Sequence, residues 1–555
     1  MLSHLTTALR RLGILAALIG VLATATPASA DTYTPISGAG STWAENAVDE
    51  WRRAVNQYGM RISYAGTGSS DGRRQFLSGT VDFAVSDIPF QTHPTDGSAA
   101  ERPAAGSYAY MPIVAGGTVF MYHLTVNGKR VTNLRLSGDV VTKIFTGVVK
   151  TWDDPVIRAD NPGLQLPHRT IVPVVRSDGS GSTAQFTLWM SNQHKALWQA
   201  YCRKAGRSGS CGQTSNYPPS PGMIAQSGDL GVAGYVAQNY GEGAIGYVNY
   251  SYALNAHYPV AKVLNHSGYY TEPTPQNVAV SLLKARINTN KNSPDYLTQQ
   301  LDGVYNDSDK RNYPLSSYSY MILPLKVRGT FSTVKGRTLG AFSYYFMCQG
   351  QQQAPKLGYS PLPINLVKAG FDQIRRIPGV QARNIDIKRC NNPTFTPDGH
   401  NRLADTAPYP KPCDKKGAPP CTSGSGGAKS GDGNGGSGGG SAAGGTANGG
   451  SSATGGNGTA GTGGSGGPSV DPDTGQTLAP GASAGGGSGG TGTGADNTVA
   501  LAQPVAVAAG HGWTATQTLM LLAAFLVLGL ILLPSVVSRL VGARSRVNAK
   551  DGDRR

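Results

Sequence analysis

The segment 176–182, Arg-Ser-Asp-Gly-Ser-Gly-Ser, combines a permanent cation, a carboxylate, hydroxyls and glycines, which are groups suited to binding an oxyanion. It follows the apolar run 171–175, which predicts a buried strand, and precedes 184–190, which predicts a helix. The first N–H groups of a helix lack partners within the helix and lie at the positive end of its dipole, so such a helix start attracts anions. The segment therefore predicts an oxyanion site. A serine N-cap after a tight turn is the alternative for this segment taken alone.

Two further corners of the chain share this glycine- and hydroxyl-rich composition. The segment 36–43 precedes a helical pattern, and the segment 66–72 lies between a short strand at 62–65 and a helix at 73–77. Open α/β sheets bind ligands at the carboxyl ends of their strands, so we expect the three corners to meet in one oxyanion cage. The corners lack the G-x-G-x-x-G order, and no Walker A loop occurs, which argues against a nucleotide site.

Asp87 follows the next predicted strand, 81–85, and is the residue that would discriminate among oxyanions. An ionised carboxylate accepts hydrogen bonds and donates none. Hydrogen phosphate and dihydrogen phosphate carry a hydrogen for Asp87 to accept, whereas sulfate at neutral pH carries none. A sulfate ion in a desolvated cage would face an unpaired carboxylate, so Asp87 predicts selectivity for phosphate. Capping the turn before Ile88 is the alternative role for this side chain.

The two ends of the chain differ in composition from its middle. Residues 1–30 have the basic, apolar and small-residue order of a secretory signal peptide, with cleavage expected after Ala30. Residues 422–497 are rich in glycine and serine and predict a flexible linker. Residues 515–538 predict a transmembrane helix and the basic residues 539–555 a cytoplasmic tail, which places the middle of the chain outside the cell. A buried core helix and a surface stalk without a receptor role are the alternatives for the span and the linker.

The globular part of the chain, residues 31–421, exceeds one typical domain and predicts two lobes. Most of the net charge of the chain, +16, lies in this part and would attract anions by long-range steering. Nucleic acid or an anionic cell-wall polymer would also suit a basic protein. Basic residues are not interleaved with aromatic ones along a stripe, so nucleic acid is not predicted as a partner.

All six cysteines lie in this globular part, and an even number in an exported protein predicts disulfides. Cys202 with Cys211, and Cys413 with Cys421, would each close a short loop, which would leave Cys348 with Cys390. The sequence alone does not fix this pairing. A zinc site is the alternative, but the chain has no Cys-x-x-Cys pair, and we predict no metal and no cofactor.

The three corners and Asp87 belong to a longer series of motifs along the chain. They are Gly38-Ala39-Gly40-Ser41-Thr42-Trp43, Gly68-Ser69-Ser70, Val81-Asp82-Phe83 with Ser86-Asp87, Ile144-Phe145-Thr146-Gly147 with Trp152, the segment 176–182, Gly243-Ala244-Ile245-Gly246-Tyr247-Val248, and Tyr313-Pro314. In this order and spacing they make the chain, from about Pro35 to about Gln373, resemble the phosphate-binding receptors of bacterial high-affinity phosphate ABC transporters.

The resemblance implies an α/β, two-lobed periplasmic-binding-protein fold of type II. Lobe 1 would comprise about residues 31–115 and 266–380, and lobe 2 about residues 116–265. Such a receptor binds inorganic phosphate between its lobes, catalyses no reaction and delivers the ion to an ABC transporter permease; we expect a monomer. The predicted C-terminal span would anchor this chain in the plasma membrane at the cell surface, whereas the family is usually free or lipid-anchored. A phosphate sensor and a surface scavenger are therefore alternatives to delivery.

The resemblance also assigns the phosphate contacts. They are Thr42, Trp43, Ser69, Asp87, Arg176, Ser180, Gly181 and Ser182, with Asp178 behind the arginine. Hydroxyls and backbone N–H groups would come from the corners, and Arg176 would supply a charged pair of donors that Asp178 holds in place. Trp43, expected to donate its backbone N–H, stands where the family commonly has phenylalanine, and Ser182 stands where it commonly has threonine. These two departures affect the wall of the cage and therefore the affinity.

A surface phosphatase and a protein that binds another oxyanion or a cell-wall polymer are the alternative functions. A phosphatase would use Ser180 as its nucleophile and would need a positioned base or a metal cluster. His123, His168 and His194 are scattered and have no metal-ligand spacing, so we expect no catalytic residues.

Overall fold

The computed structural model describes residues 33–207, 211–390, 392–396 and 398–429. All of them belong to the first of two compact units into which the chain divides, Met1–Gly439. The predicted signal peptide, the predicted transmembrane helix, the basic tail and all but the start of the predicted linker lie outside the described residues. Within the described part of the chain, no helix combines the length and the apolar character needed to cross a membrane.

The first hydrophobic core lies around parallel strands in the order β2-β1-β3. β1 (Ile36–Gly40) pairs with β2 (Ile62–Ala65) and with β3 (Phe83–Ser86), and the helices α2 (Glu45–Val55) and α3 (Ser69–Ser78) connect the strands. α2 forms here because Val48, Trp51 and Val55 recur every three or four positions and, with Ala47, are buried against this core. The carboxyl ends of the three strands therefore lie at one edge of the sheet.

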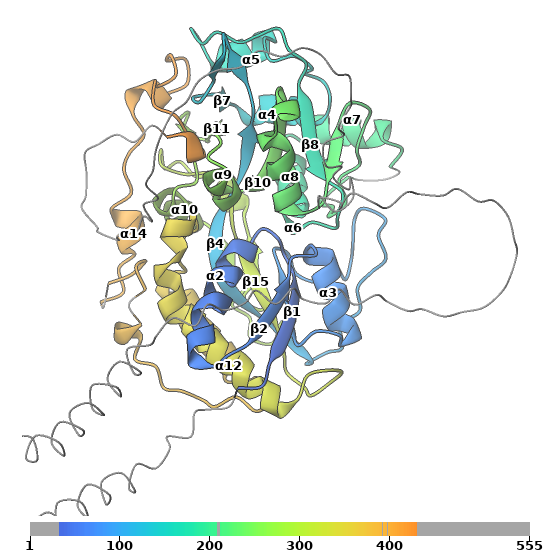
Figure 1. Cartoon of the computed structure of the whole chain (residues 1–555), viewed down its shortest axis with the longest axis vertical. Coiled ribbons are helices and arrows are strands. Elements are labelled where there is room, and N and C mark those ends of the chain that lie inside the picture. Colours follow the sequence, from blue (N-terminus) through green and yellow to red (C-terminus); the bar gives the residue numbers. More distant parts are fainter. Residues whose placement is uncertain (1–32, 208–210, 391, 397, 430–555) are drawn as a thin grey trace, which may run out of the picture. The chain divides into compact units, whose positions relative to one another are not determined.

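Two antiparallel strands extend this sheet. β15 (Ser316–Pro324) pairs with β3 on one side and with β4 (Tyr108–Tyr122) on the other. β4 is buried along its whole length of 15 residues, and beyond β15 it pairs with β10 (Ala244–Asn249). In Figure 1, β4 has β15 along one part and β10 along another, so a single strand contributes to both hydrophobic cores.

The second hydrophobic core lies around β10, β8 (Val172–Arg176) and β9 (Ile224–Gln226), which are parallel to one another. β11 (Val260–Leu264) pairs antiparallel with β4. The helices α6 (Gly181–Gln193) and α8 (Gly228–Ala237) follow β8 and β9 after short turns. This alternation of strands and helices confirms the predicted α/β class.

Phe186 fixes α6 in the second core. Its ring centroid lies 5.3 Å from that of Phe120, 5.2 Å from that of Phe145 and 5.1 Å from that of Tyr247. Full burial of a phenylalanine side chain is worth about 1.5–3 kcal/mol. The helix start, where the sequence predicts anion binding, is thereby attached to a rigid core.

α12 (Thr333–Cys348) and α13 (Ile364–Ile374) cover the first core, and Figure 1 shows α2 and α12 beside β1 and β2. The other α-helices and strands in the described part of the chain are α4 (Gly138–Phe145), α5 (Pro155–Asp160), α7 (Lys195–Lys204), α9 (Tyr250–Asn255), α10 (Pro275–Leu282), α11 (Asp302–Tyr305), α14 (Arg402–Asp405), β5 (Thr125–Val126), β6 (Lys129–Arg130), β7 (Arg135–Leu136), β12 (Tyr270–Thr271), β13 (Arg286–Ile287) and β14 (Gln299–Gln300).

The two cores divide the chain in a discontinuous way. The first core takes its residues from 36–115, from 318–395 and from Val278, and the second takes its residues from 119–315. The segment 301–315, which the predicted boundaries assign to lobe 1, packs in the second core because its apolar side chains are buried there. The lobe boundaries themselves stay a prediction.

Three disulfides join the pairs that the sequence suggested but left open, namely Cys202–Cys211, Cys348–Cys390 and Cys413–Cys421. The loop of the third disulfide is fixed by Arg135, whose guanidinium donates to the carbonyl oxygens of Cys413 at 2.8 Å and Ala418 at 2.6 Å. A segment without a recognisable motif is thus held on the second core by contacts to its backbone.

Candidate functional site

Five turns meet where the two cores adjoin, and each follows the carboxyl end of a parallel strand. These turns, called the cage below, are 40–43, 66–70, 86–88, 176–182 and 226–229. The N–H of Ser70 donates to the carbonyl oxygen of Gly179 at 2.9 Å. The amide of Gln185 in α6 donates to the carbonyl oxygen of Asp87 at 2.8 Å. The three glycine- and hydroxyl-rich corners singled out in the sequence therefore lie together.

Gly181 is packed tightly against the first core. A Cβ atom at this position would lie 2.3 Å from Oδ2 of Asp87 and 2.5 Å from Oγ of Ser69. Real Cβ atoms do not come so close to other heavy atoms, so only glycine fits here without movement. The first residue of α6 is in direct contact with a carboxylate and a hydroxyl that belong to the first core.

Asp87 is buried, with 3% of its surface exposed, and three serine hydroxyls donate to its carboxylate. Ser41 and Ser319 donate to Oδ1 at 2.7 and 2.5 Å, and Ser69 donates to Oδ2 at 3.1 Å. Burial raises the pKa of Asp87; the serine hydrogen bonds oppose this change, and the charge of Asp229 adds to it. A carboxylate in this environment gains most from a partner that brings its own hydrogen.

Arg176 ends β8 and is also buried. Asp178 accepts from Nε at 2.7 Å and from Nη2 at 2.5 Å, Asp229 accepts from Nη1 at 2.5 Å, and Thr42 Oγ1 accepts from Nη2 at 2.9 Å. Burial would lower the pKa of Arg176, but the two carboxylates outweigh it and hold the pKa above its usual range. Burial would likewise raise the pKa of Asp178, but the guanidinium and the Gly228 N–H outweigh it, so this pKa is lowered.

Asp229 is a carboxylate of the cage that the sequence analysis missed. It is the second residue of α8 and is fully buried. Thr42 Oγ1 donates to its Oδ2 at 2.6 Å, and the Asn249 N–H donates to its Oδ1 at 2.7 Å. Thr42, which the resemblance assigned to phosphate, is thus hydrogen-bonded to both Asp229 and Arg176 across the two cores.

The start of α6 offers several donors. Ser180 is the N-cap, and its Oγ accepts from the Thr183 N–H at 3.1 Å. Among the described residues, the N–H groups of Gly181 and Ser182 have no hydrogen-bond acceptor, and the buried Ser182 hydroxyl has no partner. Buried polar groups without partners are costly. This helix start therefore has the chemistry of an anion site.

Trp43 forms a wall of the cage. Its indole N–H donates to Thr118 Oγ1 at 3.1 Å, and its ring packs edge-on against Tyr359 with centroids 5.8 Å apart. A Cβ atom on Gly116 would come within 2.9 Å of the indole, so the glycine makes room for the larger ring. Phenylalanine, which the family commonly has at this position, cannot donate to Thr118, so the hydrogen bond that fixes the ring here is specific to tryptophan. In the part of the chain that the structure describes, the Trp43 backbone N–H has no acceptor.

The predicted site residues lie on four of the five turns of the cage, and their contacts with phosphate stay a prediction. Two residues at the cage, Asp229 and Ser319, were not assigned to the site from the sequence. Asp229 could have been recognised, because 226–229 reads Gln-Ser-Gly-Asp and joins a strand to a helix as the other corners do. Ser319 has no such sequence pattern around it, because it lies within the buried strand β15.

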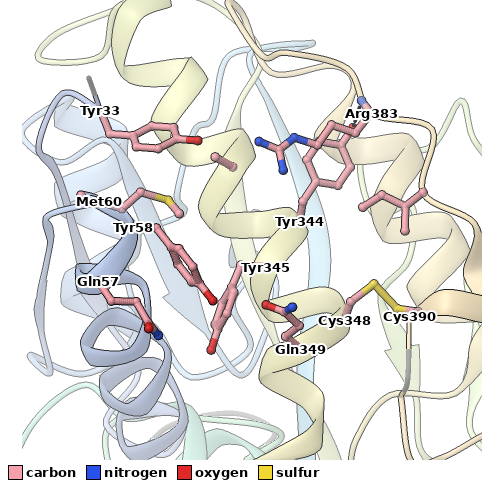
Figure 2. Close-up of a pocket in the computed structure, with 13 residues that line it drawn as sticks. Tyr33, Gln57, Tyr58, Met60, Tyr344, Tyr345, Cys348, Gln349, Arg383 and Cys390 are labelled. Carbon is pink, nitrogen blue, oxygen red and sulfur yellow. Dashed lines mark hydrogen bonds between the residues drawn. A yellow bond between two sulfur atoms is a disulfide. The ribbon is translucent and has the colours of Figure 1, made fainter. Parts of the chain in front are cut away.

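A separate pocket of about 810 Å³ is lined by residues of the first core and its surroundings. Figure 2 shows its tyrosine side chains with the Cys348–Cys390 disulfide beside them, and the rings of Tyr58 and Tyr345 lie 6.1 Å apart. None of the cage residues lines this pocket. Ligand sites are marked by converging polar groups as well as by volume, and such groups converge in the cage.

In the described part of the chain, the serine hydroxyl that a phosphatase would use makes no hydrogen bond to a histidine or a carboxylate. Ser180 Oγ accepts from the Thr183 N–H, while His123, His168 and His194 bond or pack elsewhere.

Known proteins resemble the chain over this same region. A family model described as a PBP superfamily domain matches residues 25–349. The phosphate-binding protein PstS of Xylella fastidiosa (strain Temecula1) is 31% identical over 346 residues, which cover 62% of this chain and 86% of that protein. The phosphate-binding protein PstS of Methanocaldococcus jannaschii is 28% identical over 353 residues, which cover 61% of this chain and 85% of that protein. A solved high affinity periplasmic phosphate-binding protein (PfluDING), bound with phosphate at pH 8.5, aligns with a TM-score of 0.48 and 18% identity over 63% of this chain and 100% of that one.

Proposed function

Because the chain belongs to the PBP superfamily and, within it, to the family of PstS phosphate-binding proteins, we propose that it is a receptor for inorganic phosphate. The observation that carries this proposal is the pairing of Asp87 with a set of donors in one buried cage. Arg176 supplies the positive charge there, and Asp87 supplies an acceptor for a hydrogen. Phosphate is the common oxyanion that needs both at neutral pH.

In the proposed complex the ion sits against the start of α6. The N–H groups of Gly181 and Ser182, the Ser182 hydroxyl and the Trp43 N–H donate to its oxygens, since these donors have no acceptor among the described residues. Thr42, Ser69 and Ser180 are the further contacts that we propose. Arg176 places a positive charge beside the ion, and Asp178 orients the guanidinium through two hydrogen bonds.

We also propose that the two lobes close around the ion as in a type II binding protein. The cross-core contacts support this, because Thr42 bonds to Asp229 and Gly181 touches Asp87. β4 would form part of the hinge, since it passes from the first core into the second, and so would the start of β15, which follows directly on Leu315 of the second core. Closure would exclude water and complete the set of donors.

Delivery to an ABC transporter permease and anchorage at the cell surface complete the proposal. The predicted signal peptide at 1–30 and the predicted apolar span at 515–538 favour an exported, membrane-anchored receptor, and the segment 422–497 would tether it. We propose a monomer without enzymatic activity.

Isothermal titration of the purified full chain, freed of bound ion, tests the proposal. We expect one phosphate per chain and no measurable heat with sulfate. Equal binding of the two ions, or binding of neither, would contradict the proposed function. Steady hydrolysis of p-nitrophenyl phosphate would support a phosphatase instead.

A further inference from the structure

Asp229 places a second carboxylate on the guanidinium of Arg176, in addition to Asp178. Its Oδ2 accepts from Arg176 Nη1 at 2.5 Å and from Thr42 Oγ1 at 2.6 Å. Both of these donors are proposed phosphate contacts. A phosphate ion that binds Arg176 therefore does so beside an anion that the protein itself supplies.

The side chain of Asp229 is held in place. It is fully buried, and its other oxygen accepts from the Asn249 N–H at 2.7 Å. It also lies in the first turn of α8, where the helix dipole favours a negative group. Movement out of the cage would break all three hydrogen bonds, so the carboxylate stays near the ion.

The charges of the cage do not balance. Arg176 is paired with two carboxylates, Asp178 and Asp229, and together with Thr42 they use four of its five guanidinium N–H groups. The carboxylate of Asp87 accepts from serine hydroxyls, and the nearby cation Arg73, which donates to Ser70 and Ser86, is itself paired with Glu101. The cage is therefore negative before an ion enters it. A phosphate dianion adds two charges to this set and a monoanion adds one, so repulsion in a desolvated site favours the monoanion.

Other titratable groups also face Asp229. Burial raises the pKa of Tyr252 and of Tyr359 well above the usual value, and the Asp229 charge adds to both shifts, so these phenols stay neutral. Burial raises the pKa of Glu45, and the charges of Asp49 and Asp229 add to it. Glu45 is thus a separate source of pH dependence, which the variant Glu45→Gln measures.

Resting on the proposed phosphate-binding function, we infer that Asp229 makes the receptor take up phosphate as dihydrogen phosphate in preference to hydrogen phosphate. Asp87 accepts one hydrogen of the ion, and the second hydrogen lowers the ion's charge beside Asp229. Above the second pKa of phosphate, the free ion has lost this hydrogen, so binding takes a proton from the solvent. The affinity then falls as the pH rises.

Phosphate titrations of the full chain over a range of pH, in buffers with different ionisation enthalpies, measure the affinity and the number of protons taken up. For the wild type we expect a loss of about tenfold in affinity per pH unit above the second pKa of phosphate, which is the slope for one linked proton. For Asp229→Asn we expect a nearly flat profile and less proton uptake, because the amide keeps the size of the side chain and removes its charge.

Asp82→Asn is the matched control. Asp82 is also a fully buried carboxylate with a cationic partner, Lys335 at 2.9 Å, but it precedes β3 whereas Asp87 follows it. This variant should keep the wild-type slope. An Asp229→Asn slope equal to that of the wild type overturns the inference about Asp229.

The wild type alone also tests the inference, should Asp229→Asn fail to fold. Binding without proton uptake at a pH at which free phosphate is a dianion overturns it. A flat profile in Glu45→Gln with an unchanged profile in Asp229→Asn assigns the proton to Glu45 and overturns it as well. Absence of phosphate binding by both the wild type and Asp82→Asn refutes the proposed function itself, which separates that failure from the failure of the inference.

Discussion

Replacement of Gly181 by alanine adds one methyl group where α6 touches the first core. The new Cβ atom would lie 2.3 Å from Asp87 Oδ2 and 2.5 Å from Ser69 Oγ, so the two cores must separate at this point or the side chains must move. Overpacking of this kind costs about 1–3 kcal/mol. If the two cores approach each other in the phosphate-bound form, as proposed, this cost falls on that form, and we expect the affinity for phosphate to fall by about 5- to 150-fold.

Isothermal titration measures this loss, and urea unfolding without phosphate measures the stability of the empty chain. Gly234→Ala in α8 is the matched control, because an added Cβ atom there has no neighbour within 4 Å. We expect that variant to keep the wild-type affinity and to gain about 0.5–1 kcal/mol of stability. Wild-type affinity in Gly181→Ala, or equal losses in the two variants, would show that the contact of Gly181 with Asp87 and Ser69 does not limit phosphate binding.

Three further predictions concern the charged groups of the cage. Asp87→Asn should bind sulfate more tightly relative to phosphate, because an amide donates to an unprotonated oxygen; competition titrations with the two ions measure this, and unchanged selectivity contradicts it. The same variant without phosphate should be more stable than the wild type at neutral pH, since the pKa of Asp87 is raised in the folded chain and its contribution to stability is lost as the pH rises through that pKa. Urea unfolding should show that the difference in stability between the two proteins shrinks as the pH falls toward the unfolded pKa of about 3.9. A difference that grows as the pH falls would contradict this prediction. Arg176→Ala should lose about 2–5 kcal/mol of phosphate binding, because the ion loses its countercharge and two carboxylates lose their partner; wild-type affinity by titration would remove Arg176 from the site.

The sequence was informative where the structure is locally determined. Each glycine- and hydroxyl-rich corner is a short segment between a strand and a helix. Its residue types therefore indicate both the turn that its backbone makes and the hydrogen-bond donors that it offers. The βαβ order of the first core follows from apolar periodicity, as in α2, whose buried residues recur on one face. Asp229 was within reach of the same reasoning, because 226–229 has the composition of the other corners.

Ser319 was out of reach because its position depends on strand register. The pairing of β15 with β4 shifts between Ser319 and Tyr320, and Tyr320 is paired with Ser86 of β3. Such an irregularity changes the direction of the side chains around it, and here the Ser319 hydroxyl meets Asp87. A contact between residues 232 positions apart, set by a bulge, leaves no pattern in the local sequence.

The lobe boundaries and the segment after α13 also depend on distant contacts. The chain leaves the second core after β11, places Val278 in the first core, and packs residues 301–315 in the second core again. Arg135 holds the Cys413–Cys421 loop through carbonyl oxygens, which any residue type supplies. Hydrogen bonds to the backbone of this kind cannot be recognised from side-chain composition.

A crystal structure of the full chain grown with phosphate would show directly whether the cage binds the ion. We expect one ion in the cage, with an oxygen within hydrogen-bond distance of Asp87 and others bonded to Arg176 and to the N–H groups of Gly181 and Ser182. Phosphate bound elsewhere with the cage unoccupied, or an ion in the cage that makes no contact with Asp87, would contradict this expectation.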